Sequence, residues 1–368
     1  SCCSSRSSPA SATWRPDSSG TLETPGHGTQ DQTRQHAAGI CPSAPVKLLD
    51  ASFESCRDLQ ELFQPLSPDL VALQLSCGLL KGRVQAWGFD GFRLNLLTTN
   101  QTLFLSGTRR PEPCTLALPL DPSTSDGAYQ AQGISMPWTG LMGYNRGLID
   151  FDLKLPAGAR LATVVISKAA WLDRHGQAGR PLMMKRWETT NQLEVQPPLL
   201  EQLQRHLLAL MHGQADAEQR ETSEQLMPTL IRGFEDPTAE TLPIAKRETR
   251  HQAAIDLLHW CDKNPKTPLK IEEISSEIFQ SRTSLFQGAK EHFQRTPLEL
   301  QRSIRLDRVR QLLINSKQRQ HQGLNGVSEI VEAMGFSSRS HFARRYQQHF
   351  HELPHETLQR SHGASPKL

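Results

Sequence analysis

Cysteine is scarce and unpatterned in this sequence, and histidine is nearly missing from one large region. The seven cysteines are scattered and include no CxxC pair. This argues against a disulfide framework and against a zinc finger, and it favours a reducing cytoplasm. Between Val46 and Val195, His175 is the single histidine. A histidine-rich metal site of the cupin kind cannot be built from that region.

Long apolar runs and enzyme motifs are lacking as well. The chain has no run of about 18 apolar residues, and its N-terminus lacks the apolar core of a signal peptide. Neither a GxxxxGKS/T phosphate loop nor a GxSxG elbow is present. The segment His351–His355 matches the HExxH pattern of zinc proteases, but Pro354 would break the helix that this pattern requires. We therefore predict no membrane span, no metal or other cofactor, and no enzymatic activity.

Positive charge is concentrated at one end of the chain. Of its 41 Lys and Arg and 38 Asp and Glu, 18 and 12 respectively lie from Arg250 onward. The remainder is mildly acidic. Nine of the 14 histidines also lie in this C-terminal third, so its positive charge grows below about pH 6.5. This asymmetry is suited to a protein whose C-terminal end meets a polyanion such as DNA.

One pattern occurs twice between Pro268 and Arg360. Each copy predicts a short amphipathic helix, a tight break, a second helix opened by Ser, and an end at a Pro. This is the layout of a helix-turn-helix unit, whose second helix can enter the major groove of DNA. The copies consist of Ile271–Ser275, Ser281–Leu285 and Glu291–Pro297, and of Val327–Val331, Gly335–Phe342 and Gln348–Pro354.

A single linker helix is predicted between the two copies. From Leu298 to Ser316, apolar residues recur at close to helical spacing, with four arginines among them. A helix of this length is about 28 Å long, and successive major grooves on one face of DNA lie about 34 Å apart. One chain is therefore expected to place both recognition helices in adjacent grooves and to read two boxes about 10 base pairs apart.

The candidate DNA-binding residues are the polar side chains that the apolar stripes leave outward. Leu285, Ala289 and Phe293 form the inner stripe of the first recognition helix, and Phe342, Tyr346 and Phe350 that of the second. Ser281 is expected to cap the first helix. The outward side chains can donate to base edges or phosphates. They are Arg282, Thr283, Ser284, Gln287, Lys290, Ser338, Arg339, His341, Arg344 and Arg345.

Roughly the last 110 residues resemble the DNA-binding domain of AraC/XylS-type transcription regulators. The residues that carry this resemblance are Arg305-Leu306, Val309-Arg310 and Leu312-Leu313 in the linker helix, and Gly335-Phe336, Ser340, Phe342 and Pro354 in the second unit. Gln294 and His351 depart from the family, which usually has Gly there to relieve a positive φ. A longer polar loop, Lys317–Gly326, also precedes the second unit.

Residues 46–195 are predicted to form a β-rich domain. Short apolar or alternating runs separated by turn-rich stretches suggest a sandwich or barrel. The resemblance implies a small, barrel-like domain that binds an effector. The segments Leu79–Trp87, Leu161–Ser167 and Tyr346–Gln348 also resemble the ethanolamine-utilisation regulator. The predicted runs are Leu70–Leu75, Leu79–Trp87, Phe92–Leu97, Thr102–Leu105, Thr115–Leu118, Gly147–Leu155 and Leu161–Ser167.

Four segments and an α+β fold class follow from these patterns. Residues 1–45 have almost no apolar side chains and are predicted to be a disordered tail, with a mistranslated leader from an early start codon as the alternative. The β-rich domain, 46–195, is followed by a helical dimerisation or linker segment, 196–245, and an all-α DNA-binding domain, 246–362. Pro198–His212 reads as an amphipathic helix that either packs on its own domain or dimerises.

Two functions remain open. The first is a sequence-specific transcription regulator whose N-terminal domain senses a small-molecule effector. The second is a ligand-independent regulator whose N-terminal domain only dimerises or contacts other proteins. In both, double-stranded DNA is the main partner, with RNA polymerase and a second copy of the chain as further expected partners.

Overall fold

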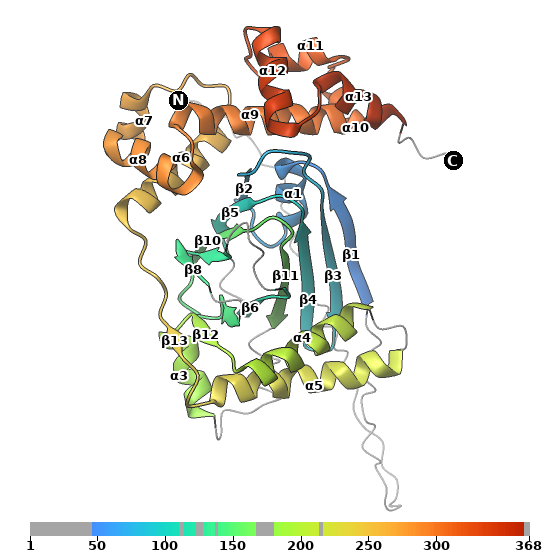
Figure 1. Cartoon of the computed structure of the whole chain (residues 1–368), viewed down its shortest axis with the longest axis vertical. Coiled ribbons are helices and arrows are strands. Elements are labelled where there is room, and N and C mark those ends of the chain that lie inside the picture. Colours follow the sequence, from blue (N-terminus) through green and yellow to red (C-terminus); the bar gives the residue numbers. More distant parts are fainter. Residues whose placement is uncertain are drawn as a thin grey trace, which may run out of the picture. The chain divides into compact units, whose positions relative to one another are not determined.

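The computed structural model describes residues 46–109, 114–121, 128–136, 139–166, 180–212 and 216–363. The predicted tail, 1–45, and His175 lie outside these ranges. Pro42–Leu368 forms one compact unit, so the predicted boundaries within it stay proposals. Figure 1 shows a strand-rich first part followed by a helical last part, which confirms the predicted α+β fold class.

The strands form two antiparallel sheets among the described residues, rather than one closed barrel. This corrects the barrel-like form of the prediction, whereas the β-rich content is confirmed. The first sheet has the order β1 (Val46–Phe53), β3 (Gly82–Phe89), β4 (Phe92–Thr99), β11 (Arg160–Ile166), β6 (Cys114–Pro119), β9 (Gly140–Met142), β12 (Gln192–Glu194) and β13 (Thr241–Leu242). The second has the order β2 (Val71–Gln74), β5 (Leu103–Thr108), β10 (Asp150–Leu155), β7 (Gln130–Ala131) and β8 (Ile134–Ser135).

The second sheet has an apolar core on each of its faces. Successive side chains of a strand point to opposite sides, so each strand contributes to both cores. Leu103 and Leu105 of β5 belong to the core between the sheets. Phe104, between them, belongs instead to a core that it shares with helices of the C-terminal part. The same alternation places Ala72 of β2 on the inner side and Val71 on the outer side.

Four helices accompany the sheets in the described part of the chain. The apolar stripe of α4 is buried in a core that includes side chains of the first sheet and of α5. This stripe is therefore occupied by packing within the chain, and it gives the predicted homodimer no support. Homodimerisation stays a prediction. The helices are α1 (Cys56–Phe63), α3 (Pro181–Thr189), α4 (Pro197–His212) and α5 (Asp216–Glu235).

The C-terminal part is helical throughout, with two helix-turn-helix units joined by α9. Thr296 and Glu299 form a capping box at the start of α9, where Pro297 takes the first helical position. The predicted linker helix is thereby confirmed. The helices are α6 (Thr249–Lys263), α7 (Ile271–Glu277), α8 (Arg282–Phe293), α9 (Pro297–Ile314), α10 (Ser316–His321), α11 (Val327–Ala333), α12 (Arg339–Phe350) and α13 (Pro354–Gly363).

The polar segment Lys317–Gly326 is not all loop, because α10 occupies its first part. The Asn315 side chain caps α10 by accepting from the backbone N–H of Gln318. Arg319 is buried, and its guanidinium donates to the carbonyls of Leu312 and Leu313 at 3.0 and 2.8 Å. A buried arginine that closes the last turn of α9 explains why this segment is helical.

Candidate nucleic-acid interface

The first recognition helix is α8, and its start is fixed by a serine. The Ser281 hydroxyl accepts from the backbone N–H of Ser284 at 3.0 Å, as predicted for a cap. Leu285, Ala289 and Phe293 are buried, which confirms the predicted inner stripe. Of the candidate residues on this helix, Ser284 is half-buried, and those exposed are Arg282, Thr283, Gln287 and Lys290.

The second recognition helix, α12, repeats this arrangement. The Ser338 hydroxyl accepts from the backbone N–H of His341 at 3.4 Å, so this candidate residue serves as the cap. The predicted inner stripe is again confirmed, because Phe342, Tyr346 and Phe350 are buried. The exposed candidate residues on this helix are Arg339, His341, Arg344 and Arg345.

Both recognition helices end in a left-handed residue. Gln294 has φ 55° after α8, and His351 has φ 57° after α12. These are the two positions where the resemblance predicted Gly. A side chain in this conformation is strained by about 1–2 kcal/mol relative to Gly. The turn geometry is therefore of the kind that the family pattern implies, although Gly is absent from both places.

The two recognition helices border one groove on the protein surface. This groove is a cavity of about 590 Å³, and Lys290, His341, Arg344 and Arg345 from the candidate set line it. The other six candidates do not line it. Arg295 and Arg302 also line the groove, although sequence reasoning did not assign them to DNA. The sequence signal for Arg302 was its place among the arginines of the linker helix.

The electrostatic surroundings of the two helices differ. On α8, Arg282 pairs with Glu272 at 2.9 Å and Lys290 lies 3.8 Å from Glu299. On α12, the three exposed arginines form no ion pair within the described part of the chain. A cation already beside a carboxylate adds less to the local positive potential than a free one. The second helix therefore offers the stronger attraction for phosphates.

His349 contributes no charge to this groove at neutral pH. Burial, together with the neighbouring Arg295 and Arg310, lowers the pKa of His349 to about 3. Its backbone carbonyl accepts from the N–H of Gly78 at 2.8 Å, so it also joins the second unit to the β-rich domain. His349 therefore adds nothing to the positive potential that lysine and arginine give this groove.

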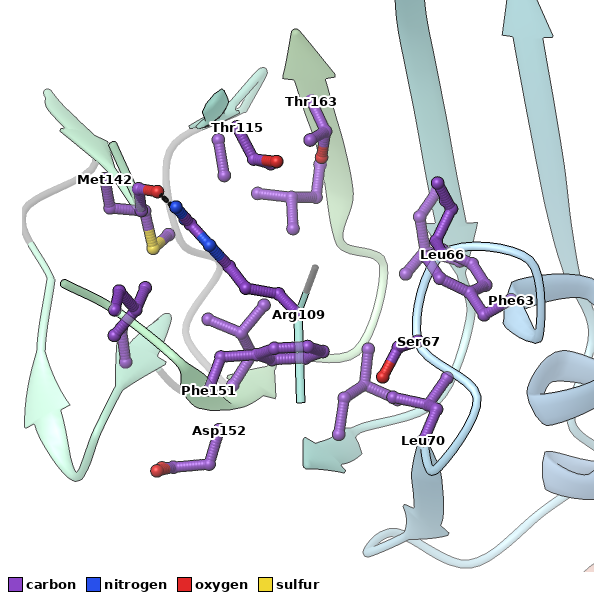
Figure 2. Close-up of a pocket in the computed structure, with 18 of the residues that line it drawn as sticks. Phe63, Leu66, Ser67, Leu70, Arg109, Thr115, Met142, Phe151, Asp152 and Thr163 are labelled. Atoms are coloured by element: carbon purple, nitrogen blue, oxygen red, sulfur yellow. Dashed lines mark hydrogen bonds between the residues drawn. The ribbon is translucent and has the colours of Figure 1, made fainter. Parts of the chain in front are cut away.

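A second cavity lies within the β-rich domain (Figure 2). It measures about 170 Å³, and most of its lining side chains are apolar. Leu105, Phe151 and Leu153 of the second sheet form one of its walls. Arg109 and Asp152 are the charged residues that line it among those described.

The second sheet is a wall shared between this cavity and the helical part of the chain. On the outer face, the Phe104 ring lies 5.0 Å from the Phe293 ring of α8, edge to face. The Ser106 hydroxyl lies 3.1 Å from Nε2 of His259 on α6. The outer face of the second sheet therefore contacts the first helix-turn-helix unit directly, so a shift of this sheet would reach that unit.

Asp152 extends this contact. Its carboxylate accepts from the Arg247 Nε at 2.8 Å, and its other oxygen lies 3.1 Å from Nε2 of His251 on α6. The His251 ring stacks on the His292 ring of α8, with 4.2 Å between centroids. Asp152 is 2% exposed, so the ion pair with Arg247 is shielded from water and salt.

No group of three His, Cys, Asp or Glu side chains that could hold a metal occurs in the described residues. None of the described helices has the length and apolar character needed to cross a membrane.

The family model that matches this chain lies in its C-terminal part. Residues 274–360 match the family model for a helix-turn-helix domain. Over 161 residues the chain is 28% identical to the HTH-type transcriptional regulator ArgR of Pseudomonas aeruginosa, covering 43% of this chain and 46% of that protein. Over 102 residues it is 26% identical to the XylDLEGF operon transcriptional activator 2 of Pseudomonas putida, covering 28% and 62%.

The chain thus spans 46% and 62% of the length of these two curated relatives. A crystal structure of a probable AraC family transcriptional regulator from Rhodopseudomonas palustris is 26% identical and covers 30% of this chain and 97% of that one, with a TM-score of 0.27. A TM-score this low supports no inference about fold. The resemblance of the N-terminal part to the ethanolamine-utilisation regulator stays a prediction.

Proposed function

We propose that the protein is a sequence-specific DNA-binding transcription regulator of the AraC/XylS type, because residues 274–360 match the family model for a helix-turn-helix domain. The observation that carries the proposal is that two Ser-capped recognition helices, α8 and α12, border one groove lined with basic side chains. Lysine and arginine on such a surface replace counterions on DNA phosphates, while polar side chains on the helices reach base edges.

The linker helix sets the spacing that this regulator reads. With 18 residues, α9 is about 27 Å long. Adding the widths of the flanking units, this length brings the two recognition helices near the roughly 34 Å that separates adjacent major grooves. We therefore propose that one chain reads two boxes about 10 base pairs apart, with α8 in one groove and α12 in the next.

Within this proposal, a small-molecule effector occupies the cavity of the β-rich domain. The support comes from the shared sheet, since Leu105 lines the cavity while the adjacent Phe104 packs on Phe293 of α8. A ligand that shifts this sheet has a short path to the first recognition helix. An effector acts only through its different affinity for two states of the protein. RNA polymerase is the further partner through which such a regulator would act.

The alternative is a regulator that needs no ligand. The two are distinguished by thermal unfolding with and without candidate metabolites, because a ligand that binds the native state alone raises Tm.

Selection of bound sequences from random duplex DNA with the full chain tests the proposed function. We expect enrichment of one sequence pattern with two conserved boxes about one helical turn apart. Arg344→Ala should weaken binding, whereas Arg205→Ala, which removes an exposed arginine from α4, should not. Recovery of an unenriched random pool with the wild-type chain would overturn the proposal.

A further inference from the structure

We propose that the cavity of the β-rich domain binds a small organic carboxylate with an apolar body, and that Arg109 holds the carboxylate group. This inference rests on the proposed function, because it names the chemical class of the effector. Arg109 directly follows β5 and is among the residues that line the cavity. Figure 2 shows its side chain extending across the cavity toward Met142.

The charge on Arg109 has no acidic partner within the described residues. Its two terminal nitrogens donate to the backbone carbonyls of Gly143 and Asn145, the latter at 3.0 Å. Its Nε is buried and has no acceptor among the described atoms. Burial accordingly lowers the pKa of Arg109. A buried cation without a counter-charge is unfavourable, and an anionic ligand would relieve it.

The other ionisable groups at the cavity do not compete for this role. Asp152 is already paired with Arg247 at 2.8 Å. Figure 2 shows its carboxylate turned away from the Arg109 guanidinium. Cys114 lies close enough to interact with Arg109, but burial raises the pKa of its thiol to about 11, so it is neutral. Among the described residues that line the cavity, Arg109 is therefore the charged group without an opposite charge beside it.

The rest of the cavity suits an apolar group. The side chains that line it include Leu97, Leu105, Phe151, Leu161 and Val165. Its volume of about 170 Å³ is below the roughly 300–1,000 Å³ of sites for drug-sized ligands. A compact acid with one short aliphatic or cyclic body matches both the size and the lining.

Two hydroxyls complete the site for a carboxylate. Thr115 and Thr163 line the cavity, and Figure 2 draws both on the side that the guanidinium approaches. Each hydroxyl can donate one hydrogen bond to a carboxylate oxygen. A guanidinium with two neutral donors is a chemically complete set for one carboxylate, whereas a neutral amide would leave the cation unpaired.

The test is ligand binding by the full chain, measured by thermal unfolding and by calorimetry. The probes are hexanoate and cyclohexanecarboxylate, each matched with its primary amide. At ten times Kd, the acids should raise Tm of the wild-type protein by about 2–4 °C. Their Kd should be roughly tenfold or more below that of the amides. Arg109→Gln should remove this difference, and Arg205→Gln should keep it.

Three results would overturn the inference: equal binding of acids and amides, an unchanged preference in Arg109→Gln, or no binding of either acid at millimolar concentration. If Arg109→Gln does not fold because it loses the contacts to Gly143 and Asn145, the wild-type preference for acid over amide decides. Thr163→Val then serves as the second variant, with an expected severalfold loss for the acids alone. None of these measurements involves DNA, so a failed ligand class and a failed DNA-binding function give separate results.

Discussion

The two helix-turn-helix units have the same local design but different neighbours. The core of the first unit includes Val71, Leu73 and Phe104 of the β-rich domain. The core of the second unit consists of C-terminal side chains, and Leu79 is the one β-rich residue that packs on it among those described. The first unit is thus part of the same apolar core as the outer face of the second sheet.

The second unit is joined to the β-rich domain by polar contacts instead. Both carboxylate oxygens of Asp307 on α9 accept from backbone N–H groups at the start of α1, those of Cys56 and Arg57, at 2.8 and 3.0 Å. Arg310, which is fully buried, donates to the Glu54 carbonyl at 2.8 Å and pairs with Glu352. The second unit therefore contacts the β-rich domain mainly through hydrogen bonds and ion pairs, rather than through a shared apolar core.

This difference indicates a division of roles. The first recognition helix contacts the sheet that walls the cavity, and its cations are partnered. The second has three exposed arginines without partners in the described residues. We infer that α12 supplies most of the attraction for DNA and that α8 carries the response to a ligand.

The largest expected effect is that of Phe104→Ala on the first unit. The Phe104 side chain is 4% exposed, and its loss should lower the free energy of unfolding by about 3–5 kcal/mol. Native-state hydrogen exchange should show greater loss of protection in α8 than in α12. Leu94→Ala, in the core of the first sheet, is the control, and it should not reduce protection in α8 more than in α12. Equal loss of protection in both recognition helices would show that the units are not differently coupled.

A smaller effect is expected for the arginines of the recognition helices. Arg344→Ala should weaken DNA binding by about 1–3 kcal/mol if the side chain contacts a base. Arg282→Ala should cost less, because Arg282 already pairs with Glu272 at 2.9 Å. Fluorescence anisotropy across a salt series measures both, and wild-type affinity should fall steeply with salt. A larger loss for Arg282→Ala would reverse the assignment of roles.

The pH dependence of stability distinguishes the second unit. The pKa of His349 is lowered to about 3 in the folded protein, below the roughly 6.5 expected when unfolded. Its contribution to stability is therefore present above about pH 6.5 and is lost as the pH falls toward 3. Between pH 7 and pH 5 this amounts to roughly 1–2 kcal/mol.

Asp307 acts in the opposite direction. Burial raises its pKa to about 6, so its contribution increases as the pH falls through 6 toward 4. Urea unfolding of wild type and His349→Gln at pH 7 and pH 5 isolates the contribution of His349 to stability, because both proteins contain Asp307. An equal fall in stability for both would show that His349 is not responsible.

The smallest effect tests the feature that the two units share. Gln294→Gly and His351→Gly should each raise the free energy of unfolding by about 0.5–1 kcal/mol. Glycine accepts φ values of 55° and 57° without strain, but its greater freedom in the unfolded chain offsets part of that gain. Thermal unfolding of each variant is the measurement. Destabilisation by either change would mean that the side chain makes a contact worth more than the strain.

Local features of both units followed from the sequence. The Ser281 cap, the two inner stripes and the need for left-handed residues at Gln294 and His351 depend on residues within a few positions of one another. Phe336, one of the residues that carry the family resemblance, is half-buried, and its ring packs under the Arg305 guanidinium at 5.1 Å. Its truncation should therefore destabilise less than that of a fully buried ring.

Features that depend on distant parts of the chain did not follow. The sequence does not distinguish Arg310 from the other arginines of the linker helix, yet Arg310 is fully buried against Glu352 and the Glu54 carbonyl. The strand Val46–Phe53 is mostly exposed and lies at the edge of the first sheet, where it pairs with β3, so it has no clear apolar alternation. The contact between the second sheet and α8 could not be predicted from the sequence, because Phe104 and Phe293, which form it, lie far apart in the chain.

Sequence selection with two point variants tests most directly whether both recognition helices read DNA. Random duplex DNA is selected with wild type, Arg282→Ala and Arg344→Ala, each as the full chain. We expect two boxes about 10 base pairs apart for the wild type. Arg282→Ala should relax one box and Arg344→Ala the other, with the spacing unchanged. If both variants relax the same box, or weaken every sequence equally without changing preference, the two-helix account is wrong.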